Sequence, residues 1–173
     1  MIRKAEKADV DSILLIINDA KELFKNNNSL QWQGTKGYPN KKTVLLDIEK
    51  GWLYLACLNN IIVGIITLAT DWEESYQIIE DGVWLNNNKY YTIHRLAIKK
   101  GFYKQGIAKM LISYIEIITK NNGVYNIRAD TALDNKAMNN LLIRCGYQRC
   151  GIIYLKQTDC LDPMRIAYQK VLN

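Results

Sequence analysis

The sequence is poor in the residues that usually build metal centres, with one histidine and four cysteines among 173 residues. The cysteines are Cys57, Cys145, Cys150 and Cys160, and no two of them form a C-x-x-C pair. A single histidine cannot complete the usual zinc-binding patterns, so we predict no metal site. An even number of cysteines leaves disulfide bonds as an alternative. We favour reduced, mostly buried thiols in a cytoplasmic protein.

Long apolar runs are also missing. No segment has the roughly 20 consecutive apolar residues that a membrane-spanning helix needs. The first residues include Arg3, Lys4, Glu6 and Lys7, where a secretory signal peptide would be apolar. Hydrophobic residues still make up 49% of the chain, which argues against disorder. The sequence therefore predicts one folded domain over residues 1–173, neither secreted nor bound in a membrane.

Apolar periodicity divides the chain into alternating strands and helices. Four helices are predicted: one that begins at Asp9, one over 43–50, one from 106 to about 120 and one from 135 onward. We expect the side chain of Asp9 to cap the first of them. A short helix is predicted around 75–81, inside a long connection over 70–89. Strands are predicted at 1–8, 52–58, 61–69, 90–98, 125–129, 150–155 and 165–170. This alternation predicts an α/β domain in which helices flank a mixed sheet.

A loop of basic and small residues, Tyr103–Lys109, separates the strand that ends at Ile98 from the next helix. Small residues at Gly106 and Ala108 allow a ligand to approach the backbone closely. The first amides of the helix have no partners within it and lie at the positive end of its dipole, which suits a pyrophosphate. The segment matches neither the Walker pattern nor the dinucleotide glycine pattern, which sets it apart from those phosphate-binding loops.

This loop resembles the acetyl-CoA loop of the GCN5-related N-acetyltransferase (GNAT) family, whose pattern runs Q/R-x-x-G-x-G/A. Gly106 and Ala108 occupy its two small-residue positions, whereas Tyr103 stands where the family usually has Gln or Arg. A second block also resembles the family, because a strand is followed by Asn135, a helix and a Gly-Tyr pair in place of Gly-Phe. Two blocks in this order favour a family resemblance over an ordinary strand-to-helix turn. The resemblance covers nearly the whole chain.

The resemblance implies a single-domain GNAT-like α/β fold, with a mixed, mostly antiparallel sheet of about six to seven strands flanked by about four helices. It also implies acetyl-CoA as co-substrate and transfer of the acetyl group to a primary amine of a small molecule or peptide. The residues implied to bind acetyl-CoA are Leu96, Ala97 and Ile98 through their backbone, then Tyr103, Lys104, Gln105, Gly106, Ile107, Ala108 and Lys109, and finally Asn135. Asn135 is equally suited to cap its helix.

Asp130 is the first candidate for the catalytic base. It lies five residues before Asn135, a relative position at which some members of the family carry a catalytic glutamate. Its alternative role is an ion pair with Arg128 or Arg95. The family position is the reason that we rank it slightly above the second candidate.

His94 is that second candidate, because an imidazole ordinarily exchanges protons near neutral pH. Strict alternation along its strand places Thr92, His94 and Leu96 on one face. A lone histidine on a strand is more often structural than catalytic. Three glutamates of the long connection, Glu73, Glu74 and Glu80, suit either attraction of a cationic amine or a solvated acidic face.

The general acid is where the chain departs most from the family. Many members have a tyrosine one residue after the leucine that matches Leu141, but here that residue is Leu142, which cannot donate a proton. Tyr103, Tyr125 and Tyr147 are other tyrosines, and none is placed at the sulfur by the sequence. The departure leaves a CoA-binding regulatory protein without turnover as an alternative function.

The formal net charge of +6 makes a nucleic-acid-binding protein the less favoured third alternative. The lysines occur in ones and twos, no basic stripe alternates with aromatics, and the phosphates of CoA account for part of the excess. The acceptor substrate is left open. Five aromatic residues in two predicted loops suit either the walls of a pocket or the interface of a homodimer: Trp32, Tyr38, Trp72, Tyr76 and Trp84.

Overall fold

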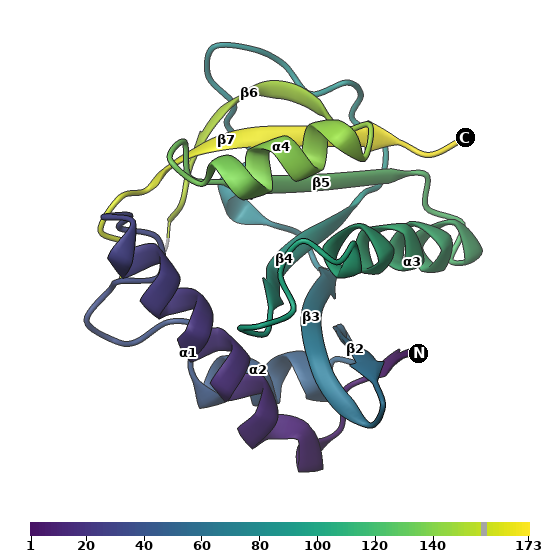
Figure 1. Cartoon of the computed structure of the whole chain (residues 1–173). Coiled ribbons are helices and arrows are strands. Elements are labelled where there is room, and N and C mark those ends of the chain that lie inside the picture. Colours follow the sequence, from purple (N-terminus) through teal and green to yellow (C-terminus); the bar gives the residue numbers. More distant parts are fainter. Residues whose placement is uncertain (157–158) are drawn as a thin grey trace.

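The computed structural model describes residues 1–156 and 159–173, and its strands form a single seven-stranded sheet (Figure 1). The strands are β1 (Ile2–Lys4), β2 (Leu53–Leu58), β3 (Ile61–Ala69), β4 (Tyr91–Ile98), β5 (Asn126–Thr131), β6 (Gln148–Tyr154) and β7 (Met164–Val171). Their order is β1-β2-β3-β4-β5-β7-β6, and only β4 and β5 run parallel. The predicted mixed, mostly antiparallel sheet is confirmed.

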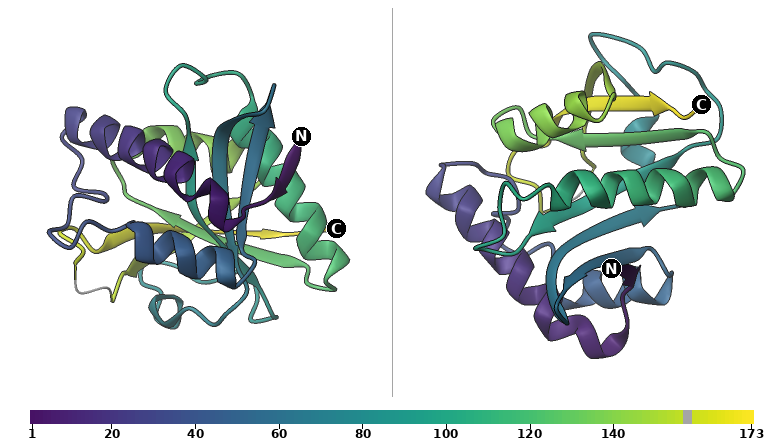
Figure 2. Two further views of the ribbon diagram at one scale, coloured as in Figure 1. Left: turned by 90° about the horizontal axis from the view of Figure 1, so that it is seen from below. Right: turned by 45° about the vertical axis from the view of Figure 1, so that its right-hand side comes forward.

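Four α-helices of the described chain flank this sheet, as predicted. They are α1 (Val10–Asn26), α2 (Lys41–Glu49), α3 (Ile107–Asn121) and α4 (Lys136–Arg144). Helices α3 and α4 share one core cluster with β2–β5 and β7, whereas α1 and α2 pack on the opposite face of β2, β3 and β4 (Figure 2). The connection over 70–89 covers β6 and β7 on the face away from α4. The sheet is thus buried on both sides.

Local backbone chemistry follows the sequence at the turns. Asn59 and Asn60 adopt positive φ values of 48° and 64° between β2 and β3, as the predicted tight hairpin requires. Gly51 ends α2 with a φ of 66°. Gly146, with a φ of 84°, ends α4 and turns the chain so that Tyr147 packs back into the core.

Two predictions for helices were wrong in detail. Asp9 is the residue before α1, but its carboxylate does not cap that helix. It accepts hydrogen bonds from Arg3 and from the backbone N–H of Glu6, and so closes the short 3-10 turn η1 (Lys7–Asp9). The short helix expected around 75–81 is a single 3-10 turn, η2 (Glu74–Tyr76).

Strand β4 contains a bulge at Arg95, whose φ of 48° lies in the left-handed region. The pairs on either side of it are Thr67 with His94 and Ile65 with Ala97, so one residue of β3 faces two of β4. The bulge breaks the alternation, because Ile93 and Leu96 pack in the same core cluster. The prediction that Thr92, His94 and Leu96 share one face is therefore wrong for Leu96.

The four cysteines are free, and of these Cys150 is buried while the other three are partly exposed. The expectation of mostly buried thiols is thus correct only for Cys150. Within residues 1–156 and 159–173, no group of three potential ligand side chains is placed to hold a metal ion. None of the helices in those ranges is both long and apolar enough to span a bilayer.

Candidate functional site

Strands β4 and β5 pair only over their first part, and a cavity lies where they separate. The parallel pairing joins residues 91–93 of β4 to 127–129 of β5 and then stops. Beyond it, residues 94–98 of β4 have no strand partner on that side within the described part of the chain, and the two strands diverge (Figure 1). A cavity of about 930 Å³ occupies this place, lined by β4, the end of β5, the first turns of α3 and α4 and the α1–α2 connection. An extended ligand can therefore bond to the free edge of β4.

One end of the cavity, which we call the donor end, has the features of an anion-binding site. Gly106 precedes α3 with a φ of 79°, and no side chain caps the helix there. The first amides of α3 thus remain available, and the cationic residues Lys104, Lys109 and Arg144 line the same cavity. A Cβ atom at Gly106 would meet nothing within 4 Å, so the approach to these amides is open.

The sequence analysis named thirteen residues as base candidates or as residues that bind acetyl-CoA, and twelve of them line this one cavity. The exception is Gln105, whose side-chain amide instead donates to the carbonyl of Gly101. Ile107 and Ala97 line the cavity although both are mostly buried. The structure thus brings the strand, the loop and both base candidates together.

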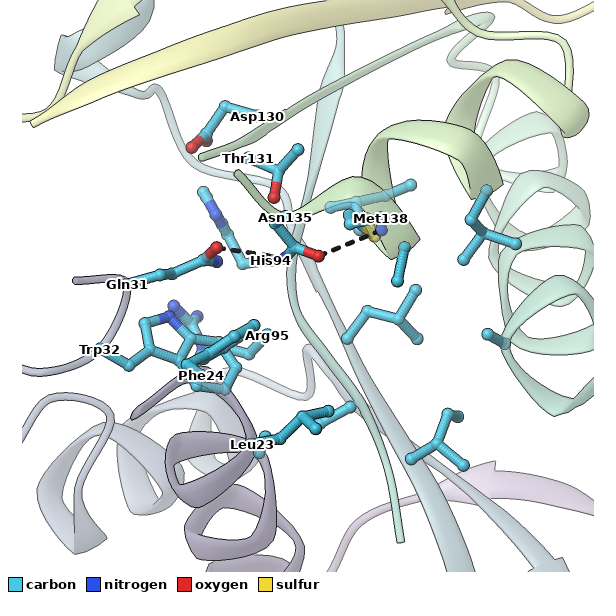
Figure 3. A pocket seen from close by; sticks show the side chains of 18 of the residues that line it. Leu23, Phe24, Gln31, Trp32, His94, Arg95, Asp130, Thr131, Asn135 and Met138 are labelled. Atoms are coloured by element: carbon cyan, nitrogen blue, oxygen red, sulfur yellow. Dashed lines mark hydrogen bonds between the residues drawn. The ribbon is translucent and has the colours of Figure 1, made fainter. Parts of the chain in front are cut away.

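Asn135 links the two walls of the cavity. Its side-chain oxygen accepts from the backbone N–H of Met138 at 3.1 Å, which caps α4 as predicted. Its Nδ2 donates to Oε1 of Gln31 at 3.1 Å, a residue of the α1–α2 connection (Figure 3). The second contact was not predicted, because it joins residues 104 positions apart.

Asp130 is held by a buried tyrosine rather than by the arginines proposed from the sequence. The hydroxyl of Tyr76 donates to its Oδ1 at 2.6 Å, and Nε of Arg165 lies 3.8 Å from its Oδ2. Burial, together with the charge of Asp130, raises the pKa of Tyr76 well above its usual value, so this hydroxyl stays a donor. The expected pairs fail because Arg128 stacks 4.0 Å from the rings of both Trp84 and Tyr90, and Arg95 binds Asp47.

His94 has a carboxylate partner that the sequence did not identify. Its Nε2 lies 3.5 Å from Oε2 of Glu73, and Oε1 of Glu73 accepts from the backbone N–H of Ser75. The contact with His94 lowers the pKa of the Glu73 carboxyl, against the opposing effect of burial. Glu73 therefore stays ionised beside the imidazole, and both side chains line the cavity.

The predicted aromatic residues divide between the cavity and other places. Trp32 and Tyr38 line the cavity, and Trp32 packs edge-on against Phe24 with ring centroids 5.4 Å apart. Tyr76 belongs to the connection and is buried against β6 and β7, with its ring against Trp84. Trp72 is 68% exposed and lies outside the cavity.

The model of the acetyltransferase (GNAT) family matches residues 17–147, most of the chain. The chain belongs to the GNAT acetyltransferase family. None of the curated protein sequences compared with it matches.

Solved structures agree with this assignment. A GNAT acetyltransferase of Streptococcus agalactiae is 31% identical with a TM-score of 0.87, and the match covers 100% of this chain and 95% of that one. Two more distant structures show the fold. A GNAT acetyltransferase of Listeria monocytogenes is 23% identical with a TM-score of 0.75, and the match covers 99% and 94% of the two chains. The ribosomal-protein-alanine N-acetyltransferase of Brucella melitensis is 18% identical with a TM-score of 0.70, covering 99% of both chains.

The hydroxyl that many GNAT proteins carry on α4 is missing, and the structure offers a different one at the cavity. Leu142 is fully buried in the core and does not line the cavity. Thr131, at the end of β5, does line it, and its Oγ1 is buried with no hydrogen-bond partner among the described residues. In Figure 3 this hydroxyl points into the space between Asn135 and His94. No sequence pattern singled out Thr131.

Proposed function

We propose that the protein is an N-acetyltransferase that takes the acetyl group from acetyl-CoA and transfers it to a primary amine. The observation that carries this proposal is the free edge of β4 ending beside the uncapped start of α3. Lys104 and Lys109 flank that helix start in sequence and line the cavity, which suits the diphosphate of CoA. The edge of β4 then leads a pantetheine arm toward His94 and Asp130.

The reaction needs a base, and the contacts favour His94 over Asp130. Both oxygens of Asp130 already face donors, Tyr76 and Arg165. The imidazole of His94 faces one ionised carboxylate, which stabilises the imidazolium formed when it takes a proton. In this scheme Glu73 orients His94, and Asp130 contributes negative charge that attracts an ammonium ion.

The bonds change as follows. His94 removes a proton from the ammonium group, and the amine nitrogen attacks the thioester carbon. The carbon–nitrogen bond forms, the carbon–sulfur bond breaks, and the second proton that the nitrogen must lose passes to the departing sulfur, so that CoA leaves as the thiol. Backbone amides on the free edge of β4 stabilise the negative charge on the acetyl oxygen, a contribution that is usually large in acyl transfer.

Two measurements test the proposal. Acetyl-CoA at a hundredfold above its dissociation constant should stabilise the fold by about 2.7 kcal/mol, which raises the melting temperature by roughly 5–10 °C in a domain of this size. A thiol-release assay over a panel of amines should then detect free CoA.

The outcomes separate the candidate functions. A thermal shift without thiol release for any amine indicates a CoA-binding regulator, the function that Leu142 suggests. No shift at millimolar acetyl-CoA rejects the proposal. Oligonucleotide binding that weakens steeply with salt and is not displaced by CoA would favour a nucleic-acid binder instead.

A further inference from the structure

The end of the cavity away from α3, the acceptor end, has a distinct composition. We define it by six side chains: Phe24, Trp32, Glu73, His94, Asp130 and Arg165. Figure 3 shows four of them, Phe24, Trp32, His94 and Asp130, on the side opposite α3. Glu73 and Arg165 belong there because they contact His94 and Asp130.

The guanidinium of Arg95, which also lines the cavity, is already neutralised. Its Nε and Nη2 donate to the two oxygens of Asp47 at 2.7 and 2.8 Å, and its Nη1 donates to the hydroxyl of Tyr38 at 2.7 Å. The Asp47 side chain is almost fully buried, so little solvent reaches this bidentate pair. A substrate carboxylate would have to displace a buried partner to reach Arg95.

Arg165 is also engaged, mainly by neutral acceptors. Its Nη1 donates to the carbonyls of Asp162 and Met164 at 2.5 and 2.7 Å, and its Nη2 lies 3.5 Å from the sulfur of Cys160. Its Nε faces Asp130 at 3.8 Å. Among the described residues, therefore, neither arginine at this end has a free donor pair for a ligand carboxylate. The two residues outside the described ranges are Gln157 and Thr158, which carry no charge.

Negative charge, in contrast, remains available to a ligand. Glu73 is ionised and its side chain is 31% exposed. Two further carboxylates line the cavity with partners of their own: Asp130 faces Tyr76 and Arg165, and Asp159 accepts from the hydroxyl of Thr35 and the backbone N–H of Lys36. An ammonium group gains from these carboxylates, and from the faces of Trp32 and Phe24 if it passes over them. A carboxylate beside the amino group would face like charge, while the two nearby arginines, Arg95 and Arg165, are already engaged, which penalises such a ligand.

We propose that the acceptor is a primary amine without a carboxylate next to the amino group, such as an arylalkylamine or a diamine, rather than an α-amino acid. This inference rests on the proposed function and narrows its acceptor. The chemistry is the same transfer: a carbon–nitrogen bond forms, the carbon–sulfur bond of acetyl-CoA breaks, one ammonium proton passes to His94 and the second passes to the CoA sulfur.

Matched pairs that differ only in the carboxylate provide the test. Tyramine is compared with tyrosine and agmatine with arginine, because neither amino acid has a second primary amine, and kcat/KM is measured by thiol release. In each pair that turns over, we expect the amine to exceed the amino acid by at least about a hundredfold, because like-charge repulsion and an unpaired buried carboxylate act together. Ratios within about threefold, or a preference for the amino acid, overturn the inference.

Two variants locate the source of the discrimination. Asp130→Asn should lower kcat/KM for both members of a pair, and this common loss drops out of their ratio. The ratio of amine to amino acid should nevertheless fall about tenfold, because one charge that repels the substrate carboxylate is removed. Glu74→Gln is the matched control: Glu74 adjoins Glu73 but is exposed, pairs with Lys156 and does not line the cavity. It should leave rates and ratio unchanged. An unchanged ratio in Asp130→Asn contradicts the electrostatic explanation.

Failure of this inference is distinguishable from failure of the proposed function. If no member of any pair is acetylated, the proposed acceptor class is wrong, whether or not acetyl-CoA binds. A thermal shift with acetyl-CoA in that same sample would show that the donor half of the proposed function still holds. Absence of both results rejects the two together.

Discussion

Replacing Gly106 by glutamate tests where the phosphates of acetyl-CoA bind. Gly106 and Gly123 lie at opposite ends of α3 with φ values of 79° and 70°, and a Cβ atom at either position meets nothing within 4 Å. A side chain therefore costs about the same at both, roughly 1–2 kcal/mol of left-handed strain. That cost lowers the melting temperature by about 2–8 °C without unfolding the protein. Gly123→Glu is thus a control for strain.

The two variants differ in what the new charge meets. At Gly106, a carboxylate about 4–5 Å from a phosphate raises the free energy of the complex by about 3–4 kcal/mol at an effective dielectric constant of about 20. The dissociation constant of acetyl-CoA should then rise more than about a hundredfold. Calorimetric titration at near-physiological salt measures it, and Gly123→Glu should keep the wild-type value. Equal affinities in the two variants would show that the phosphates bind elsewhere.

Two further substitutions test the groups around the acetyl carbon. His94→Gln should lower kcat by about two to four powers of ten and Asp130→Asn by less, whereas near-full rates in both would exclude both side chains as the base. Tyr76→Phe removes a donor from Asp130 and should destabilise the fold by about 1 kcal/mol in urea titrations. The pKa of Tyr76 is higher in the folded than in the unfolded state, so its neutral hydroxyl contributes to folding stability. That contribution is complete below about pH 10, the ordinary tyrosine value, and is lost as the pH rises further. The variant should lack that part of the alkaline loss of stability.

Much of the fold and the donor end could be predicted because their signals are short-range. Helices and strands follow from apolar periodicity within one segment. The donor end is made by the backbone of consecutive residues around Gly106, so the order of residues almost specifies its geometry. Asn135 caps its helix through a residue three positions away, which is also a local interaction. None of these features requires knowledge of how distant segments meet.

The chemistry of the acceptor end depends on distant segments and was largely missed. Glu73 and Tyr76 belong to an irregular connection, and nothing in its composition indicates which carboxylate or hydroxyl turns toward β4 or β5. Arg95 is the clearest case, since a left-handed arginine inside a strand has no sequence signature. The buried pair with Asp47 and Tyr38 holds it there, and local strain is tolerated where surrounding contacts determine the conformation.

The hydroxyl of Thr131 is a further consequence of this arrangement, and Thr131→Val tests it. A buried hydroxyl without a partner costs about 1–3 kcal/mol, so the isosteric valine should raise the melting temperature of the free protein by several degrees. The same change should lower kcat about tenfold if the hydroxyl donates to the departing sulfur in place of the tyrosine that Leu142 replaces, and Thr131→Ser should restore the rate. A protein stabilised by valine yet fully active would show that the hydroxyl has no partner in the complex. We therefore expect the wild-type protein to melt at a lower temperature than Thr131→Val but to have a higher kcat, because its hydroxyl is unpaired in the free protein and paired only in the complex.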